Sequence, residues 1–415
     1  MNGTEANGSA NASFSRRLCH SSAPFIYTRF VTVAIFGSTI ALVSIAENVL
    51  LFFTFTTRRI YRQSYALYFI FLAVFDIIVC FSYILLNPVN VVMDYTRNYA
   101  MLQFWVTYVI WMVAISQCAM TASSVLLLAA SFEQFLVTTQ SPLHHFVQRY
   151  RLQICFASVL IGIFICGSLA FEYRVVHRVA CAGTLSEYSL AWSKLAKVPF
   201  VRVFWRFYFR DIATVFLPFF AIAFFNCKAL LSLHQQHKGF NTKGGSKVIS
   251  ALLSDEESFW RQQRIALAIR KRSATRTFIW LTISYIASNS LTAFITGWEH
   301  INSKSLLSFR NFYYLSIDAS GILKVLACTL RLPIYYFCKP ELRAHLKLMF
   351  CCLCHALSAS APRGAKRRLA LASVANGHVV LRESQSGQKL NGLPSFEVAN
   401  ETFSDTAPLD KVLWV

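Results

Sequence analysis

The sequence predicts an all-α fold, in which a bundle of seven transmembrane helices is followed by a short amphipathic surface helix. Three observations predict it: seven apolar stretches alternate with short polar segments, 55% of the residues are hydrophobic, and only 14% are charged. A helix crosses about 30 Å of hydrocarbon with about 20 apolar residues, because it satisfies its backbone hydrogen bonds internally. The predicted spans are 30–55, 65–91, 103–132, 152–171, 208–231, 275–295 and 312–336.

The amino-terminal arm, residues 1–28, carries three motifs for asparagine-linked glycosylation, at Asn2, Asn7 and Asn11. This motif is glycosylated only on the lumenal or extracellular side of a membrane, so we expect the arm to be extracellular. The same motif at Asn400 falls in the predicted cytoplasmic tail and is interpreted as a chance match.

The loops of the seven-helix domain, residues 29–338, are basic on one side. With the amino terminus outside, 25 Lys and Arg residues lie on the cytoplasmic side and 13 on the other. The short first loop is the clearest case, with Arg58, Arg59 and Arg62. The positive-inside rule therefore predicts a multi-pass protein with a cytoplasmic carboxyl terminus. This distribution explains the net charge of +21 without a nucleic-acid partner.

The third cytoplasmic loop, about 232–273, begins with glycines among polar residues and ends in a basic amphipathic stretch. We expect the part between Phe259 and Arg272 to be helical. Two interpretations stay open for this helix: it continues helix six at the lipid headgroups, or it contacts a cytoplasmic partner.

Residues 339–354 are predicted to form a surface helix and its anchor in the membrane lipids. The apolar face of the helix comprises Leu342, Leu346 and Met349. Its basic face comprises Lys339, Arg343 and Lys347. Three thiols follow, which palmitoylation would turn into an additional anchor or which stay unmodified: Cys351, Cys352 and Cys354. Residues 355–415 are rich in Ser, Thr, Gly and charges, and we expect a disordered cytoplasmic tail.

Of the 12 cysteines, only Cys19 and Cys181 fall clearly on the extracellular side. Most of the others lie in spans or in the cytoplasmic tail, where thiols stay reduced. We therefore predict a disulfide between Cys19 and Cys181, which would tie the amino-terminal arm to the second extracellular loop.

Several positions in the spans form known helix signatures. They are Asn48 in Glu47-Asn48-Val49-Leu50, Asp76 in Leu72-Ala73-Val74-Phe75-Asp76, Ser123 ten residues before Glu133, Pro218, and Pro333-Ile334-Tyr335-Tyr336. With them, the chain resembles the rhodopsin-like (class A) G-protein-coupled receptors over residues 25 to about 350. Glu172, Asn226 and Asn289 make it similar, within that family, to invertebrate FMRFamide-type neuropeptide receptors.

The resemblance implies an extracellular peptide ligand on one side of the membrane, and a heterotrimeric G protein and arrestin on the other. The residues expected to face the G protein are Glu133, Gln134, Asn226, Arg270 and Tyr336. The chain departs from the family at Glu133-Gln134-Phe135, where the family has Asp/Glu-Arg-Tyr. Because the arginine of that motif is absent, arrestin binding to the Ser/Thr-bearing tail is an alternative output.

Four ionisable residues fall at membrane depth: Glu47, Asp76, Lys324 and Arg331. Each costs roughly 2.5–3.5 kcal/mol at a helix centre unless it is paired. Helices one, two and seven adjoin in the family fold, so we expect Asp76 and Glu47 to neutralise the two cations, beside Asn48 and Ser123. The sharper hypothesis is that Arg331 replaces the sodium ion of typical family members. The alternative is that Arg331 extends to the cytoplasmic headgroups.

Polar and aromatic residues in the outer turns of several helices are predicted to line a ligand site. They are Tyr83, Asn87, Tyr108, Trp111, Arg206, Asp211, Trp298 and Asp318. Trp and Tyr at this depth also serve as interfacial anchors. The carboxylates of Asp211 and Asp318 would suit a cationic group, such as the arginine of an Arg-Phe-amide peptide. The basic second loop would instead favour an acidic ligand segment.

Other classes of membrane protein fit the residues less well. The histidines do not form the several clusters that a di-iron enzyme needs, and no catalytic triad or HExxH motif occurs, so we expect no enzyme, metal or cofactor. A transporter is the alternative of another class, although the chain has no internal repeat. We therefore predict a cell-surface neuropeptide receptor, with a chemosensory receptor for a small molecule as the second possibility.

Overall fold

The computed structural model describes residues 25–57, 66–242, 255–339 and 342–347. Seven of the helices in these residues are long and apolar enough to cross a membrane, which confirms the predicted all-α seven-helix bundle. The spans are Ile26–Thr57, Ala66–Thr96, Tyr99–Thr139, Arg151–Glu172, Phe204–Ser232, Ser273–Glu299 and Asn311–Cys338. Most of them extend several residues beyond the predicted stretches, because helical hydrogen bonding continues past the apolar residues that the prediction relied on.

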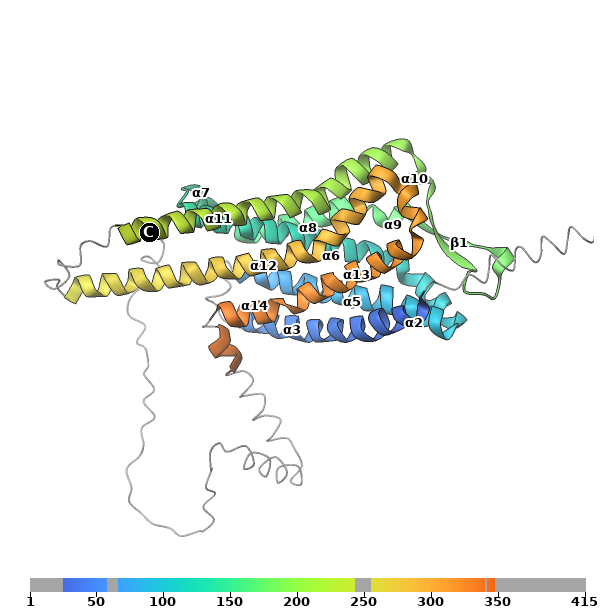
Figure 1. The fold of residues 1–415 in the computed structure, drawn as a ribbon, viewed down its shortest axis with the longest axis horizontal. Coiled ribbons are helices and arrows are strands. Elements are labelled where there is room, and N and C mark those ends of the chain that lie inside the picture. The colour runs from blue at the N-terminus through green and yellow to red at the C-terminus, as the bar shows by residue number, and fades with distance from the viewer. Residues whose placement is uncertain (1–24, 58–65, 243–254, 340–341, 348–415) are drawn as a thin grey trace, which may run out of the picture. The chain divides into compact units, whose positions relative to one another are not determined.

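The first three spans are formed by the following elements (Figure 1). They are α2 (Ile26–Arg29), the π-helix η1 (Phe30–Gly37), α3 (Ser38–Thr57), α5 (Ala66–Thr96) and α6 (Tyr99–Thr139). Asn98 begins α6, since its side-chain oxygen accepts the backbone N–H groups of Ala100 and Met101 at 3.0 and 3.3 Å. The helix ends at Gln140, whose φ of 55° lies in the left-handed region.

The region from the loop before the fourth span to the loop after it contains the only strands in the described residues. These elements are α7 (Leu143–Arg149), α8 (Arg151–Cys166), α9 (Leu169–Glu172), β1 (Tyr173–His177), the 3-10 helix η2 (Val179–Cys181), β2 (Tyr188–Trp192) and α10 (Lys194–Lys197). The two strands pair antiparallel, with Tyr173 opposite Trp192 and His177 opposite Tyr188. The sequence analysis did not predict this hairpin. We call the end of the bundle where it lies the hairpin end.

The remaining elements complete the bundle. They are the π-helix η3 (Phe200–Phe216), α11 (Leu217–Thr242), α12 (Asp255–Ser308), α13 (Arg310–Thr329) and α14 (Arg331–Cys338). A proline has no N–H for the helical bond to the residue four before it. Pro218 lies next to the change from η3 to α11, and Pro333 lies just after the interruption at Leu330 between α13 and α14.

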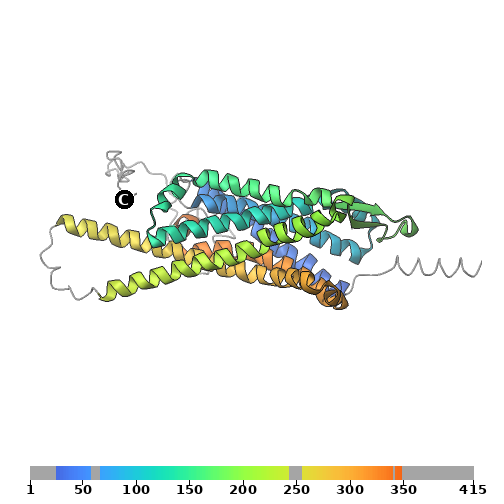
Figure 2. The same ribbon diagram turned by 90° about the horizontal axis from the view of Figure 1, so that it is seen from above.

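The predicted third loop is largely helical. Of residues 232–273, α11 continues through Thr242 and α12 starts at Asp255, so the basic stretch is a continuation of helix six. Figures 1 and 2 both show α11 and α12 extending beyond the other helices at the end opposite the hairpin. The continuation of helix six is thus observed, whereas contact with the lipid headgroups and contact with a cytoplasmic partner both stay predictions.

The helices pack in a closed arrangement around α6. Along the chain α3 contacts α5, α5 contacts α6, and α6 contacts both α8 and α11, while α12 and α13 return the chain to α3. The contact between α6 and α8 depends on Gly162, because a Cβ there would lie 2.8 Å from the carbonyl oxygen of Cys118. Small residues let helix backbones approach closely in membranes in this way.

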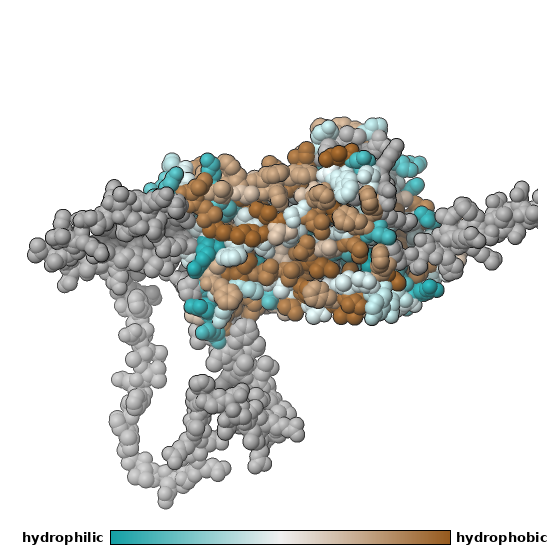
Figure 3. All heavy atoms as spheres, in the orientation of Figure 1, coloured by the Kyte–Doolittle hydropathy of each residue, from teal (hydrophilic) through white to brown (hydrophobic). Residues whose placement is uncertain are grey.

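The largest buried cluster lies towards the end opposite the hairpin and draws residues from all seven spans. The helix formed by residues 342–347 joins it, because Leu342 and Leu346 are buried there while Arg343 and Lys347 are exposed. Two residues of the predicted apolar face therefore pack against protein, and the third, Met349, lies outside the described residues. Of the predicted basic face, Lys339 is instead buried, with its ammonium 4.3 Å from the ring centre of Phe69. On the outside of the bundle, apolar side chains form the middle of the visible face and hydrophilic ones gather towards its two ends (Figure 3).

Several predictions concern residues outside those the structure describes. They are the glycosylation motifs at Asn2, Asn7 and Asn11, the thiol of Cys19, the arginines of the first loop, the palmitoylation candidates Cys351, Cys352 and Cys354, and the tail 355–415. These stay predictions.

Candidate functional site

A closed polar cluster lies between helices two, three and seven. It comprises Asp76, Ser123, Cys328 and Arg331. One guanidinium nitrogen of Arg331, Nη1, lies 2.7 Å from Oδ2 of Asp76, and Nη2 donates to the hydroxyl of Ser123 at 3.5 Å. Asp76 is 1% exposed, so this ion pair is almost completely removed from solvent. Arg331 therefore turns into the bundle, which is contrary to the alternative that it extends to the headgroups.

The cluster borders a small cavity of about 60 Å³. Besides charged residues, hydroxyl and amide groups line this cavity. They belong to Ser123, Ser124, Ser284, Ser288, Asn289 and Tyr285. A cavity of this size with several polar partners can hold ordered water. Asn48 lies nearby, where its side-chain N–H donates to the carbonyl oxygens of Ser44 at 2.9 Å and Cys328 at 3.4 Å.

A second and larger cavity, of about 450 Å³, opens towards the hairpin end, and we call it the hairpin-end cavity. Four helices and β2 surround it. Its polar and aromatic lining comprises Tyr83, Asn87, Asn90, Trp105, Ser116, Gln117, Thr292, Thr296, Glu299, Tyr313, Ser320 and Lys324. Leu190 of β2 also lines it, so the hairpin contributes to its wall. Val79, Met120 and Lys324 line both cavities, which are therefore adjacent.

Of the eight residues predicted to bind a ligand, Tyr83 and Asn87 line the hairpin-end cavity. Tyr108 donates its hydroxyl to the carbonyl oxygen of Leu85 at 3.0 Å instead. Trp111 is 58% exposed on the outside of the bundle. Trp298 packs against the rings of Phe294, Phe309 and Phe312. None of these last three residues lines the cavity.

The predicted charged ligand residues have protein partners. Arg29 forms a buried ion pair with Asp318, with Nε 2.6 Å from Oδ2. Arg206 places its guanidinium 3.9 Å from the ring centre of Trp192, and Asp211 lies 4.0 Å from Nε of Arg210. Asp318 and Asp211 thus lie beside arginines, and neither lines the hairpin-end cavity.

Helix rotation explains which residues reach the cavity. On helix two the lining residues are Val79, Tyr83, Leu86, Asn87 and Asn90, and on helix seven they are Tyr313, Ile317, Ser320, Gly321 and Lys324. This spacing of three and four marks one helical face. Asp318 and Trp298 are each one position away from a lining residue and so face a neighbouring helix or the outside. Periodicity applied to each span was the signal that could have found the cavity.

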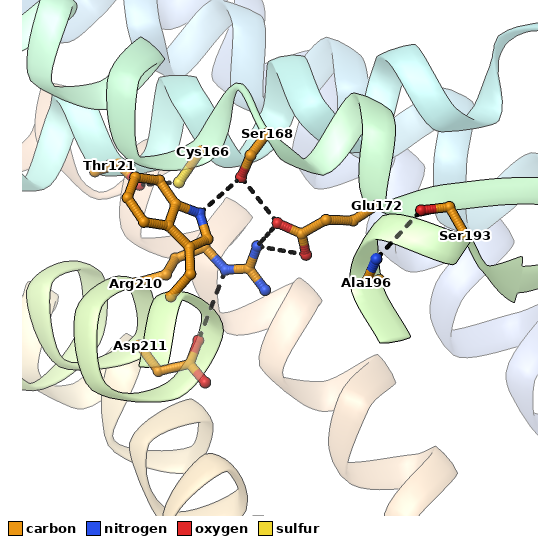
Figure 4. A network of polar contacts seen from close by, with 9 residues as sticks. Thr121, Cys166, Ser168, Glu172, Ser193, Ala196, Arg210 and Asp211 are labelled. Carbon is orange, nitrogen blue, oxygen red and sulfur yellow. Dashed lines mark hydrogen bonds and ion pairs between the residues drawn. The ribbon is translucent and has the colours of Figure 1, made fainter. Parts of the chain in front are cut away.

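A buried network joins the fourth and fifth spans near the hairpin end (Figure 4). Nη1 of Arg210 donates to both carboxylate oxygens of Glu172, at 2.8 and 2.9 Å, and Glu172 is 0% exposed. The hydroxyl of Ser168 donates to Glu172 at 2.8 Å and accepts the indole N–H of Trp205 at 3.0 Å. Glu172 was named from the sequence only for the family resemblance, and its partner was not predicted.

The loop that holds the hairpin is fixed by Glu187. Its carboxylate accepts the backbone N–H of Gly183 at 2.6 Å, the hydroxyl of Tyr99 at 2.8 Å and contacts Nε2 of His177 at 2.9 Å. The Gly183 N–H, followed by the Tyr99 hydroxyl, lowers the pKa of Glu187 to about 2. Cys181, in the same loop, is disulfide-bonded. Its partner is outside the described residues, so the pairing with Cys19 stays a prediction.

At the end opposite the hairpin, the residues expected to face a G protein are largely engaged with the bundle. Glu133 accepts two hydrogen bonds from Nε of Arg151, at 2.9 and 3.0 Å. Gln134 donates its side-chain N–H to the hydroxyl of Thr275 at 2.7 Å, which links α6 to α12. Asn226 is buried and donates to the carbonyl oxygen of Ile222 at 2.9 Å.

The other two residues of that set are Tyr336 and Arg270. Tyr336 is half-buried on α14, with its ring in edge contact with Phe337. Arg270 lies on α12, and its side chain is outside the described part of the chain. No group of three or more His, Cys, Asp or Glu that could hold a metal ion occurs among the described residues.

The seven apolar helices and their internal polar contacts define the class of the molecule: it is a multi-pass membrane protein with seven spans. No protein-family model and no curated protein matches the sequence.

Proposed function

We propose that the chain is a cell-surface receptor of the rhodopsin-like class, whose hairpin-end cavity faces the outside and binds the activating ligand. One observation carries this proposal: a cavity of about 450 Å³ meets the closed polar cluster inside the bundle at Val79, Met120 and Lys324. Its volume lies within the range of about 300–1,000 Å³ that is typical of ligand sites.

A receptor also needs a cytoplasmic end that responds to the ligand, and the end of the bundle opposite the hairpin suits this role. There the hydrogen bond between Gln134 and Thr275 holds α6 and α12 together. A ligand that favours separation of these helices would open a cytoplasmic cleft by shifting a two-state equilibrium. Gln134 takes the place of the family arginine, so the link that must break is a neutral hydrogen bond.

We propose a peptide as the ligand and a heterotrimeric G protein or arrestin as the cytoplasmic partner. The resemblance to neuropeptide receptors supports the peptide. A small-molecule ligand is the second candidate, because the cavity volume suits it and Leu190 of β2 contributes to the wall near the opening. A transporter, the alternative of another class, would move its ligand across the membrane, which a receptor does not do.

Two experiments test the proposal. Epitope tags fused to Met1 and Val415 should be accessible from opposite faces of intact cells, and access from one face alone would contradict it. The full chain should then respond to a neuropeptide library in calcium or arrestin assays. A response to volatile compounds alone would replace the peptide by a small molecule, and uptake of a bound compound into cells would favour the transporter.

A further inference from the structure

Lys324 has an unusual position in the protein. It lies halfway along the span Asn311–Cys338 and lines both the hairpin-end cavity and the smaller cavity beside it. Its ammonium group makes no hydrogen bond or ion pair with the part of the chain that the structure describes. A cation at membrane depth is expected to have a partner. We therefore expect a negatively charged group to bind next to the ammonium of Lys324.

The nearby carboxylates do not supply that group. Asp76 lies against Arg331 at 2.7 Å, and Asp318 lies against Arg29 at 2.6 Å. Glu47, the partner expected from the sequence, lines neither cavity.

Among the described residues, Glu299 is the only carboxylate in the wall of the hairpin-end cavity, and it is exposed at the end of span six. Lys324 lies 13 residues below Asn311, the first residue of span seven. At 1.5 Å per residue, this places Lys324 about 20 Å below that end of the span. Glu299 therefore belongs to the opening of the cavity, and Lys324 belongs to its base.

We propose that the hairpin-end cavity binds its ligand through a carboxylate, which Lys324 holds at the base of the cavity. The inference rests on the proposed receptor function and names the chemistry of the ligand. The ammonium has three donors for such a group, and Ser320, Thr292 and Gln117 line the same cavity with further hydrogen-bonding groups. Trp105 and Tyr313 add aromatic surface for an apolar portion of the ligand.

This proposal differs from the cationic ligand group considered from the sequence. The expected acceptors, Asp211 and Asp318, lie beside arginines outside the cavity. An amidated Arg-Phe peptide would bring a cation and no terminal carboxylate towards a lysine that already lacks a partner among the described residues. Two sources of the required group remain, the carboxylate of a peptide and that of a small organic acid, and the experiment separates them.

The experiment uses the full chain purified in lipid nanodiscs and measures its thermal unfolding midpoint against probe concentration. The small probe is 3-phenylpropionate, and its neutral match is 3-phenylpropionamide. The peptide probe is an acetylated Phe-Phe dipeptide with a free carboxylate, and its match is the same dipeptide amide. A rise with the small acid identifies a small-acid site, a rise with the peptide acid alone identifies a peptide carboxylate, and either supports the proposal.

Three variants locate the effect. Lys324→Met should weaken binding of the acids at least about tenfold, because a charge-assisted hydrogen bond is lost. Lys324→Arg should retain most of the binding of the acids, which would show that a protein altered at this position still folds. Lys197→Met is the matched control, since Lys197 is an exposed lysine of α10 that does not line the cavity. It should bind the acids as the unaltered protein does.

Three results would overturn the proposal: the amides bind as tightly as the acids, the acids bind Lys324→Met unchanged, or neither acid raises the midpoint. A chain that signals in response to amines or amides would overturn it too, while leaving the proposed receptor function intact. Failure of the topology or signalling tests would instead remove the receptor function itself.

Discussion

Lys324 and Arg331 are two cations on the same span, seven residues apart, and their surroundings differ. Arg331 lies 2.7 Å from Asp76 and donates to Ser123, beside a cavity of about 60 Å³. Lys324 lines a cavity of about 450 Å³ and makes no polar contact with the described residues. One cation is therefore part of the folded core, and the other faces a cavity without a partner among the described residues.

The difference shows how one helix can serve stability and recognition together. A buried charge with a partner resists removal of that partner, because the remaining charge is left unpaired. A buried charge without a partner weakens the empty protein and favours binding of an opposite charge. Satisfied and unsatisfied polar groups of this protein are therefore expected to respond to substitution in opposite ways.

The largest effect is expected at the closed polar cluster. Asp76→Asn leaves Arg331 without a counter-ion, which should lower the free energy of unfolding by about 3–5 kcal/mol. The double variant Asp76→Leu with Arg331→Met removes both charges and should be much less destabilised. Thermal and denaturant unfolding in detergent measure the free energy of unfolding of the single and the double variant. If the single and double variants lost equal stability, the ion pair would not be what holds this cluster.

Sodium provides the next test, because Arg331 occupies the side of Asp76 where a cation would bind. Replacing sodium by N-methylglucamine should leave the unfolding midpoint of the unaltered protein unchanged. Arg331→Met should gain a sodium dependence, worth about 1.4 kcal/mol at a sodium concentration ten times the dissociation constant. A sodium dependence of the unaltered protein, or none in the variant, would contradict the hypothesis.

The hydrogen bond between Gln134 and Thr275 is a satisfied contact without charge, so a smaller effect is expected. Gln134→Ala or Thr275→Val removes about 1 kcal/mol, which should raise basal arrestin or G-protein signalling about fivefold. The two changes combined should add little to either one, since both remove the same bond. Thr139→Val, an exposed position on α6, is the control. Additive effects would argue against a shared contact.

The smallest effect is expected at Glu187, outside the membrane. A free glutamate titrates near 4.5 and Glu187 titrates at about 2, so its contribution to stability is complete above pH 4.5 and is lost as the pH falls towards 2. The midpoint difference between the unaltered protein and Glu187→Gln should narrow over this range. A constant difference for Glu187→Gln would contradict the assignment.

The sequence was sufficient for the seven spans, because the length and polarity of each segment decide whether it can cross hydrocarbon. It also anticipated the ion pair between Asp76 and Arg331, since a buried carboxylate and a buried guanidinium on neighbouring helices rarely stay apart. The same argument expected Glu47 to help neutralise Lys324 and Arg331, and Glu47 forms no ion pair with either of them in the described residues. Charge balance predicts that partners exist, and only the rotation of each helix selects them.

The ligand site was harder to predict for the same reason. Trp111 is at a suitable depth, but Val109 and Val113 on either side of it carry the face that lines the cavity. Likewise Arg29 and Asp318 are 289 positions apart in the chain, and nothing in their local sequences indicates their contact. Glu172 and Arg210 form a similar long-range pair. Depth follows from position along a span, whereas pairing requires the packed bundle.

The difference between the two cations is decided by the unfolding midpoints of two matched variants without ligand and in sodium-free buffer. Lys324→Met removes a cation that has no partner among the described residues, so we expect a higher midpoint than that of the unaltered protein. Arg331→Met leaves Asp76 without its partner, so we expect a lower midpoint. Midpoints that shift in the same direction would contradict the distinction between the two cations.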